Sequence, residues 1–341
     1  MNAVNDFLPR LMRAENLSRV ESLRLLEWLL NGAATDAQIA ATLIALKRKG
    51  ETVEELAGFA EGMRGRATRI NSRHQRFIDT AGTGSSCAKT FNVSTAAAFV
   101  IAGAGLPVAK HGNRAASSLC GSADVLSVMG VNVSSTPALS EICLNDHGIC
   151  FMFAPLYHAA TSRVAAIRRE LGVPTTFNLL GPLTNPAGAP RQIIGVSDAA
   201  MLEPLAATLA MLGTERAWVV HGSDGLDEVT IAGPTFVVEA TPAGIHRFQI
   251  QPEDFGLARS SLEGLGGGDA AANAEIIRAV LSGKRRDAAR SLVIANAAAA
   301  LRVGGVTDSL AEGREQAEES IDSGAAMNTL NELIRVTNQT D

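Results

Sequence analysis

The sequence contains few aromatic residues and few cysteines. Aromatic side chains make up only 4% of the 341 residues, so the core must be built mainly from aliphatic side chains. The four cysteines have no Cys-x-x-Cys spacing and are too sparse for a disulfide framework. These features exclude a small disulfide-stabilised secreted domain, and we interpret the cysteines as buried or loop thiols.

The sequence also lacks an excess of basic residues and a long hydrophobic run. Its 30 basic and 35 acidic residues give a net charge of −5, without the broad basic surface that binding to a phosphate backbone requires. No apolar run reaches the roughly 20 residues of a membrane-spanning helix, and the chain starts without the basic segment of a signal peptide. We therefore expect a cytoplasmic protein that binds neither nucleic acid nor membranes.

The N-terminal part carries the signals of successive helices. Three capping boxes, each a Ser or Thr followed three positions later by Glu or Gln, are Ser18…Glu21, Thr35…Gln38 and Thr52…Glu55. Apolar residues follow at helical spacing, as in Val20, Leu23 and Leu26. Glycines suited to helix ends are Gly32, Gly50 and Gly65. We predict a small helical domain over residues 1–72.

From about residue 76 the pattern changes to short apolar runs that alternate with helical stretches. The runs have the length and composition of strands and lie at 77–79, 107–110, 149–153, 192–196 and 217–221. Residues 235–250 suggest a hairpin, and helices return from about residue 270. The alternation predicts an α/β fold with a mainly parallel central sheet, in a large domain over residues 73–341.

Two polar loops are expected at the carboxyl ends of neighbouring strands, where open α/β sheets bind ligands. The first contains Gly82-Thr83-Gly84 and leads to a helix whose first N–H groups can bind phosphate, although it matches neither a Walker loop nor Gly-x-Gly-x-x-Gly. The second, residues 110–124, combines two cations, a histidine, an amide and three hydroxyls. Either loop alone could be a solvated turn, but together they predict a site for a polyanion.

An acidic loop and an arginine pair complete the candidate residues. Asp224, Asp227 and Glu228 lie within five residues of one another, and such carboxylates repel one another unless a cation lies among them. Because Mg²⁺ prefers oxygen ligands and bridges carboxylates to phosphates, we predict a magnesium site, with an acidic surface turn as the alternative. Arg168 and Arg169 are either surface charges or, through a planar guanidinium, a site for a substrate carboxylate.

Several long motifs run through the chain. They are Gly82-Thr83-Gly84, Thr90 to Thr95, Lys110 to Arg114, Gly121 to Asp124, Arg168 to Gly172, Phe177 to Pro186 and His221 to Glu228. Their residues, order and spacing closely resemble the anthranilate phosphoribosyltransferase family over almost the whole sequence. The resemblance implies an enzyme of tryptophan biosynthesis. Such an enzyme transfers the 5-phosphoribosyl group of phosphoribosyl pyrophosphate to the amine of anthranilate, giving N-(5-phosphoribosyl)anthranilate and diphosphate.

The resemblance also implies roles for individual residues. Phosphoribosyl pyrophosphate would be bound by Gly82, Ser85, Ser86, Thr90, Asn92, Ser94, Thr95, Lys110, Ser118 and Ser122. Mg²⁺ would be held by Ser94, Asp227 and Glu228. Anthranilate would face Gly82, His111, Asn113, Ala154, Pro155, His158 and Arg168. The catalytic residues would be Lys110, His111, Asn113 and Arg168, with His111 in a hydrogen-bonding role.

The family has a fold related to that of the nucleoside phosphorylases. A central helical piece, here about residues 163–190, packs on the N-terminal helical domain, and members usually form homodimers through that domain. We expect both features here. The apolar stripes of the N-terminal helices, which are wide for a small domain, also favour a dimer contact.

Departures from the family pattern leave other functions open. Ser85-Ser86-Cys87 stand where the family usually has Gly-Asp-Gly, and Ala159-Ala160-Thr161 follow His158 where the family usually has Pro-Ala-Met or an aromatic residue. Alternatives are a phosphoribosyltransferase with a different aromatic acceptor and a non-catalytic binding relative. A pyrimidine-nucleoside phosphorylase is a further alternative, but the Asp227-Glu228 pair argues against it, because phosphorolysis has no diphosphate for Mg²⁺ to neutralise.

Overall fold

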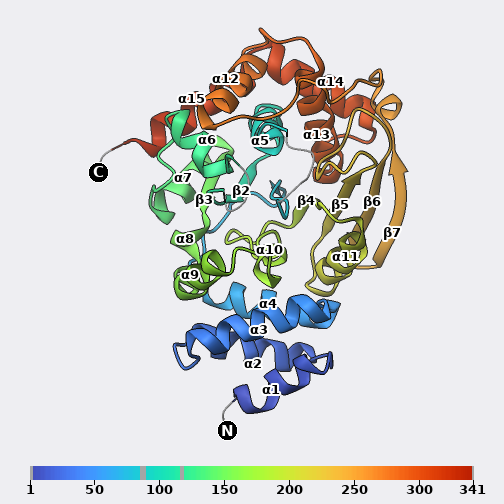
Figure 1. Cartoon of the computed structure of the whole chain (residues 1–341). Helices are drawn as coiled ribbons and strands as arrows, with labels where there is room; N and C mark the ends of the chain where they lie inside the picture. The colour runs from blue at the N-terminus through green and yellow to red at the C-terminus, as the bar shows by residue number, and fades with distance from the viewer. Residues whose placement is uncertain (1–2, 85–89, 116–118, 340–341) are drawn as a thin grey trace.

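The computed structural model describes residues 3–84, 90–115 and 119–339 of the chain. Its N-terminal helices are α1 (Ala3–Met12), α2 (Arg19–Leu30), α3 (Asp36–Lys49) and α4 (Val53–Arg66), which form the lower end of the molecule in Figure 1. All three predicted capping boxes are confirmed. In each, the hydroxyl of the cap residue accepts a hydrogen bond from the backbone N–H three residues later, whose side chain bonds back to the cap N–H.

Two details of the predicted helices are wrong. Helix α4 continues one residue past Gly65 to Arg66, and Ala67 is its C-cap residue. Val20 in α2 is 60% exposed, whereas Leu25, Leu26 and Leu29 are buried. The buried face is shifted because α2 packs closely on α4, with Leu26 against Gly62.

A single sheet forms the centre of the rest of the molecule (Figure 1). Its strands are β1 (Ile78–Asp79), β2 (Val108–Gly112), β3 (Ile149–Phe153), β4 (Arg191–Gly195), β5 (Arg216–Gly222), β6 (Thr235–Thr241) and β7 (Gly244–Ile250). Their order is β3-β2-β1-β4-β5-β6-β7, with parallel pairing from β3 to β5 and antiparallel pairing beyond. The predicted mainly parallel α/β fold is confirmed, and the expected hairpin is an extension of the same sheet.

Helices connect the strands and cover both faces of the sheet. They are α5 (Val93–Gly103), α6 (Ser122–Val128), α7 (Pro137–His147), α8 (Ala154–Tyr157), α9 (Ser162–Leu171), α10 (Thr176–Leu180), α11 (Leu202–Met211), α12 (Ala270–Leu281), α13 (Ala288–Gly304), α14 (Leu310–Asp322) and α15 (Ala325–Thr337). Among the described residues, no helix combines the length and the apolar character needed to cross a bilayer.

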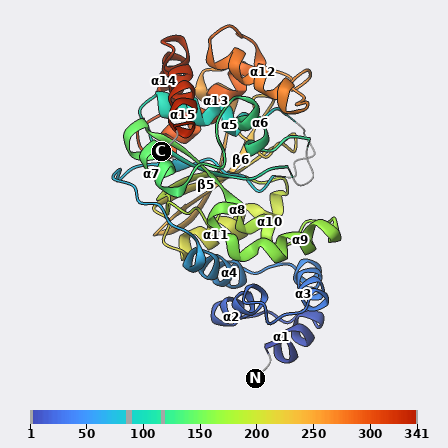
Figure 2. The same ribbon diagram turned by 90° about the vertical axis from the view of Figure 1, so that its left-hand side faces the viewer.

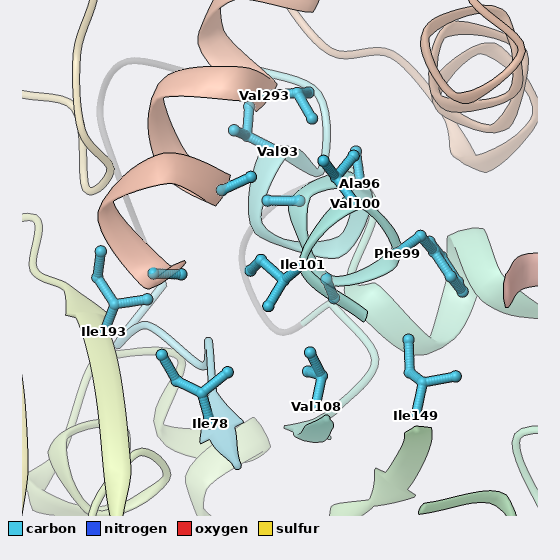
Figure 3. Packing of buried hydrophobic residues seen from close by; sticks show 14 of the residues in the cluster. Ile78, Val93, Ala96, Phe99, Val100, Ile101, Val108, Ile149, Ile193 and Val293 are labelled. Carbon is cyan, nitrogen blue, oxygen red and sulfur yellow. The ribbon is translucent and has the colours of Figure 1, made fainter. Parts of the chain in front are cut away.

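The two faces of the sheet belong to two different apolar clusters, as the twofold periodicity of strands requires. Ile193 and Val220 pack into the cluster that contains α5 and α13, whereas Ile194 and Val219 point to the opposite side. Figure 3 shows strand residues of the first face beneath the side chains of α5, with Val293 of α13 beside them.

The second face of the sheet shares its core with the N-terminal helices. Leu205 of α11 and Phe59 of α4 belong to the same buried cluster as Ile194 and Val219. Helices α9 and α10 also contact α3 and α4, so this part of the chain lies between the helical end and the sheet (Figure 2). Because the apolar core is continuous, the N-terminal helices help to hold the lower side of the sheet in place.

The strand order reverses between β1 and β4. The connection from β1 to β2 runs through α5 on one face, and the connection from β4 to β5 runs through α11 on the other. Loops that leave such neighbouring strands diverge, and the crevice between their carboxyl ends is the usual ligand site of open α/β sheets. We therefore expect the functional site among the loops after β1, β2, β4 and β5.

Candidate active site

A cavity of about 270 Å³ lies at this crevice. Its wall combines the loop after β1, the first turn of α5, the end of β2, the end of β4 and the loop after β5. The predicted site residues that the structure brings together there are Gly82, Thr90, Asn92, Ser94, Thr95, Lys110, His111, Asn113, Ser122, Asp227 and Glu228. Ser85, Ser86 and Ser118 lie outside the described residues, as does Cys87.

Two glycines allow two loops and the end of a strand to meet beside this cavity. A Cβ atom on Gly82 would lie 3.0 Å from the carbonyl oxygen of Gly195, and one on Gly195 would overlap the carbonyl oxygen of Asp227. The Thr83 N–H donates to the Gly195 carbonyl at 2.9 Å. The loop after β1, the end of β4 and the loop after β5 are therefore in direct backbone contact.

The N-terminus of α5 faces the cavity. Asn92 occupies the N-cap position, but its side chain makes no capping hydrogen bond to the helix. The Ser94 N–H donates to the Glu228 carboxylate at 3.1 Å. The first turn of a helix carries partial positive charge, so this end of α5 suits a phosphate or diphosphate.

Lys110 supplies a cation beside this helix end and is only 4% exposed. Its ammonium lies 3.1 Å from the Thr80 hydroxyl, 3.3 Å from the Thr80 carbonyl and 3.4 Å from the Ser94 hydroxyl. Burial lowers the pKa of Lys110, while the carboxylates of Asp79 and Glu228 oppose this shift. Its hydrogen-bond partners are uncharged oxygens, so a bound anion could pair with the ammonium directly.

Asp79 lies beneath the site as a fully buried carboxylate. It accepts hydrogen bonds from the Asn185 amide at 2.7 Å and from the His111 N–H at 3.2 Å. Burial raises the pKa of Asp79 to about 6, and Asn185 and Lys110 oppose the shift. Asn185 also donates to the Ala109 carbonyl at 2.8 Å, so this network ties β1 to the end of β2.

The acidic loop after β5 divides into two parts. Asp224 accepts hydrogen bonds from the Leu226 N–H and the Thr230 hydroxyl, so it stabilises its own turn and the predicted cluster of three carboxylates is wrong. Asp227 and Glu228 line the cavity. Loss of hydration, followed by the Asp227 carboxylate, raises the pKa of Glu228 to about 8.

The donor set near the acid pair fits Mg²⁺. The described part of the chain holds no group of three or more His, Cys, Asp or Glu side chains arranged around a metal. Asp227, Glu228 and the Ser94 hydroxyl nevertheless offer hard oxygen donors, and a cation among them would neutralise the charge of the neighbouring Asp227 and Glu228 carboxylates. Mg²⁺ commonly binds through one or two carboxylates and completes its shell with water and substrate phosphates.

A second group of predicted residues extends from His111 in the cavity wall to His158 and Arg168, which lie beside the cavity. The rings of His111 and His158 are 5.2 Å apart, and Arg168 donates to the Asn178 side chain at 3.0 Å while its guanidinium lies over the Phe177 ring. His111 Nε2, His158 Nε2 and Arg168 Nε are buried without a hydrogen-bond partner in the described structure. Such atoms favour a polar ligand, because burying them unpaired is costly.

Ala154 and Pro155 begin the short helix α8, directly after β3. Ala154 is half-buried and Pro155 is exposed, and neither lines the cavity. Tyr157, the last residue of α8, and His158, which follows it, are both buried. Helix α8 thus lies next to the histidine pair.

Both histidines of this pair should contribute to acid sensitivity. Burial lowers the pKa of His111 to about 3 and that of His158 to about 4, below the usual 6.5. Between about pH 6.5 and 4 the unfolded chain binds protons at these histidines and the folded chain does not. The free energy of unfolding is therefore fully retained above about pH 6.5 and decreases as the pH falls through this window. The decrease is up to roughly 1.4 kcal/mol per pH unit for each histidine.

We expect H158Q to flatten the dependence of unfolding free energy on pH in this window. Urea unfolding at several pH values measures the slope. The exposed His246 provides the control, and H246Q should leave the slope unchanged. Equal slopes for wild type and H158Q would contradict the assignment of a neutral, buried His158.

Several cavity residues were not predicted from the sequence. They are Thr80, Gly195, Gly267, Gly268, Asn273 and Asn296. A signal existed for some of them, since three consecutive glycines precede the N-cap Asp269, and Asn273 and Asn296 interrupt apolar, Ala-rich helices. A buried asparagine needs hydrogen-bond partners, so an amide on an apolar helix face indicates a specific contact.

The comparisons with known proteins agree with this geometry. Residues 74–327 match the family model described as "Glycosyl transferase family, a/b domain", and residues 5–67 match "Glycosyl transferase family, helical bundle domain". The chain is 50% identical over 327 residues to the anthranilate phosphoribosyltransferase of Moorella thermoacetica, covering 96% of each chain. It is 48% identical over 334 residues to that of Rubrobacter xylanophilus, covering 98% of this chain and 97% of the relative.

Solved structures show the same similarity. The anthranilate phosphoribosyltransferase of Thermus thermophilus superimposes with a TM-score of 0.92 at 38% identity, covering 99% of this chain and 100% of that one. The Saccharomyces cerevisiae enzyme in complex with PRPP and Mg gives a TM-score of 0.89 at 28% identity, covering 98% and 97%.

Fold and family models together define a glycosyltransferase with a helical-bundle part and an α/β part, and a cavity lies at the crevice of its sheet. Within that class, the chain belongs to the anthranilate phosphoribosyltransferase family. The family resemblance drawn from the motifs is confirmed, and the chain is an enzyme. This finding favours the transferase over both the nucleoside phosphorylase and the non-catalytic relative.

Proposed function

We propose that this enzyme transfers the 5-phosphoribosyl group of phosphoribosyl pyrophosphate to the amine of anthranilate, as a cytoplasmic step of tryptophan biosynthesis. Relatives named for this activity support the proposal. The observation that carries it is the position of Ser94, whose hydroxyl contacts the Lys110 ammonium and whose N–H contacts Glu228. A cation, a helix N-terminus and an acid pair thus converge on one cavity, as a magnesium diphosphate requires.

The donor side of the proposed reaction needs electrostatic stabilisation more than covalent help. The C1–O bond of phosphoribosyl pyrophosphate breaks and its electron pair leaves with the diphosphate, which Lys110 and the N–H groups of α5 stabilise. Ser94, Asp227 and Glu228 would hold Mg²⁺, which when bound neutralises diphosphate charge. The remaining proposed contacts are Gly82, Thr90, Asn92, Thr95 and Ser122, together with Ser85, Ser86 and Ser118 outside the described residues.

The acceptor side depends on positioning. The lone pair of the anthranilate amine forms the C1–N bond, and the nitrogen then releases a proton to solvent or to a nearby acceptor. An aromatic amine is neutral near pH 7, so no strong base is needed first. His111 is neutral, and the Gly181 carbonyl lies 3.2 Å from its Nδ1, so this nitrogen carries the proton and the unpaired Nε2 can accept a hydrogen bond from the amine.

We assign the anthranilate carboxylate to Arg168, since a guanidinium can bind both of its oxygens. Gly82 and Asn113 line the cavity on the donor side, and His158, Ala154 and Pro155 continue from His111 toward α8. This arrangement would place the amine of the acceptor between the two groups of residues.

A fluorescence assay tests the proposed function. Anthranilate fluorescence should fall when the enzyme is mixed with phosphoribosyl pyrophosphate and Mg²⁺, and diphosphate should appear in equal amount. Diphosphate released with another aromatic amine but not with anthranilate would replace the acceptor and keep the phosphoribosyl chemistry. If anthranilate fluorescence did not fall and no diphosphate appeared with any acceptor, the proposal would be overturned.

The acid pair provides a direct prediction. The double variant D227N/E228Q should need more Mg²⁺ and more phosphoribosyl pyrophosphate for half-maximal rate, because its amides hold a divalent cation less well than carboxylates do. Titration of Mg²⁺ at fixed substrate measures the effect. The matched control is D224N in the same loop: within the described part of the chain the Asp224 carboxylate accepts hydrogen bonds only from its own turn, so this variant should not alter the Mg²⁺ requirement. Unchanged Mg²⁺ dependence in the double variant would remove both residues from the metal site.

We also propose that residues 1–72 form a helical domain with residues 163–190 packed on it, that residues 73–341 form the second domain, and that two copies pair through the helical domain. The large hydrophobic side chains Met12, Val20 and Ile44 are 70%, 60% and 39% exposed on these helices, which supports a covered surface there.

Light scattering tests the dimer. The wild-type mass at micromolar concentration should be twice the 35.5 kDa of one chain. A buried charge at a subunit contact is strongly unfavourable, so V20D should shift the equilibrium to monomer. V128D serves as the control, because Val128 is 52% exposed but lies on α6. A monomeric wild type would contradict the pairing.

A further inference from the structure

Asn273 lies on α12 and is only 2% exposed, yet it lines the cavity. Its side chain is part of a relay that crosses three separate segments. The Gly268 N–H donates to Asn273 Oδ1 at 2.8 Å, Asn273 Nδ2 donates to Asn92 Oδ1 at 3.0 Å, and Asn92 Nδ2 donates to the Cys120 carbonyl at 3.2 Å.

The direction of this relay follows from its two ends. Gly268 offers a backbone N–H, which can only donate, and Cys120 offers a backbone carbonyl, which can only accept. The oxygen of the Asn273 amide must therefore face Gly268, and its nitrogen must face the oxygen of Asn92. The backbone groups at the two ends of the relay therefore fix the orientation of both amides.

The behaviour of Asn92 shows that its side chain is committed to this relay. Asparagine at an N-cap normally accepts a hydrogen bond from the first turn of its helix, but Asn92 makes no such bond to α5. Its oxygen is instead used by Asn273 and one of its N–H groups by Cys120. Among the described residues its second N–H has no partner, and it can bind a ligand in the cavity that Asn92 lines.

A neighbouring contact joins the glycine-rich loop before α12 to the segment that leads into α5. Gly268 and its neighbour Gly267 follow an antiparallel bridge between Thr90 and Gly266, and a Cβ atom on Gly267 would lie 2.6 Å from the Thr90 carbonyl. Asn273 thus holds both the loop before α12 and the N-cap residue of α5.

We propose that Asn273 is a positioning residue for the phosphoribosyl donor, which acts by holding the Asn92 amide with an N–H directed at the ligand. This inference rests on the proposed function, since it takes phosphoribosyl pyrophosphate as that ligand. Asn273 itself needs no contact with the substrate. Its loss would free the Asn92 amide to rotate and to cap α5, and the donor would lose a preorganised hydrogen bond.

The variants N273A, N92A and N92A/N273A test this role. N273A should raise the KM and the calorimetric Kd for phosphoribosyl pyrophosphate on the order of tenfold, the usual weight of one preorganised polar contact, and change the anthranilate KM less than about twofold. Because Asn273 acts through Asn92, the double variant should bind the donor no more weakly than N92A alone.

Ser320 offers a matched control for stability. It is a buried residue of another C-terminal helix, and its hydroxyl donates at 2.8 Å to the Val100 carbonyl of the same α5, away from the cavity. S320A should lower the melting temperature without altering the donor KM. A similar donor KM for S320A and N273A would reduce Asn273 to a structural role and overturn the inference.

Other outcomes would overturn either the positioning role of Asn273 or the proposed function. An unchanged donor KM in N273A, an equal rise in both KM values, or additive losses in the double variant would each overturn the positioning role while the wild type remains active. A wild type that neither binds phosphoribosyl pyrophosphate nor forms product would instead overturn the proposed function, and with it the inference.

Discussion

Replacing Arg168 by alanine should weaken the use of anthranilate by a factor between about 30 and several thousand, with little change in the KM for phosphoribosyl pyrophosphate. This range corresponds to about 2–5 kcal/mol, the usual cost of removing one partner of a desolvated, hydrogen-bonded charge pair. Steady-state kinetics with each substrate varied in turn measures the split, which should appear in the KM or the kcat/KM for anthranilate.

The surroundings of Arg168 explain why the effect should be large. Its guanidinium is half-buried, stacks on Phe177 and donates to Asn178, while its Nε has no hydrogen-bond partner in the described structure. Burial lowers the pKa of Arg168, but a guanidinium stays protonated at neutral pH. A charged, preoriented group with an unused donor is suited to a carboxylate, whose negative charge would lose its partner in the variant.

Arg169 is the internal control for this prediction. Consecutive residues of a helix point about 100° apart, and Arg169 is exposed on α9. R169A should therefore have nearly wild-type kinetics. Selective loss of anthranilate binding in R169A, with a silent R168A, would show that the assignment is wrong by one position. If neither variant affected anthranilate, Thr161 and its neighbours would point to a different acceptor.

Replacing Gly195 by alanine should destabilise the enzyme by about 3 kcal/mol and abolish most of its activity. The added Cβ atom would overlap the carbonyl oxygen of Asp227, and a backbone atom cannot move aside as a flexible side chain can. Overpacking in a close backbone contact costs about 1–3 kcal/mol and occasionally more, so we expect the upper end of this range. The shift would also displace the acid pair from the N-terminus of α5.

Urea unfolding and the Mg²⁺ requirement measure the two consequences of G195A separately. Gly65 provides the control, because it is an exposed residue of α4 and an added Cβ atom there would meet no other atom within 4 Å. G65A should be neutral or stabilise the protein by about 0.4–1 kcal/mol through the unfolded state. A G195A variant as stable and as active as wild type would show that the three segments do not touch as described.

Some features of the molecule depend on residues that are neighbours in the chain. Each capping box joins a hydroxyl to a residue three positions later, so its hydrogen bonds form within one turn of helix and the sequence alone predicts them. The alternation of strands and helices is equally local, because apolar period and length distinguish the two. The mainly parallel sheet followed from it through the short list of allowed connections.

The motifs identified the family and implied separate residue sets for the donor, the metal and the acceptor, but only the structure shows where each set lies. Lys110, Ser94 and Glu228 converge on the cavity, whereas Arg168 and His158 lie beside it around His111. The carboxylate of Asp224 turned away because a hydroxyl of its own loop satisfies it. Spacing alone could not distinguish Asp224 from Asp227, since both occupy the same short polar turn.

The sequence by itself determined the local helices, the class of fold, the family and the chemistry available in the loops. Only the tertiary structure decided which distant segments complete the cavity, such as Asn273 against Asn92 and the carbonyl of Asp227 against Gly195. It also decided that Val20 faces outward and Leu26 inward. The reason is physical: capping and periodicity arise from contacts within a few residues, whereas these choices depend on how the strand order brings together segments up to 181 residues apart.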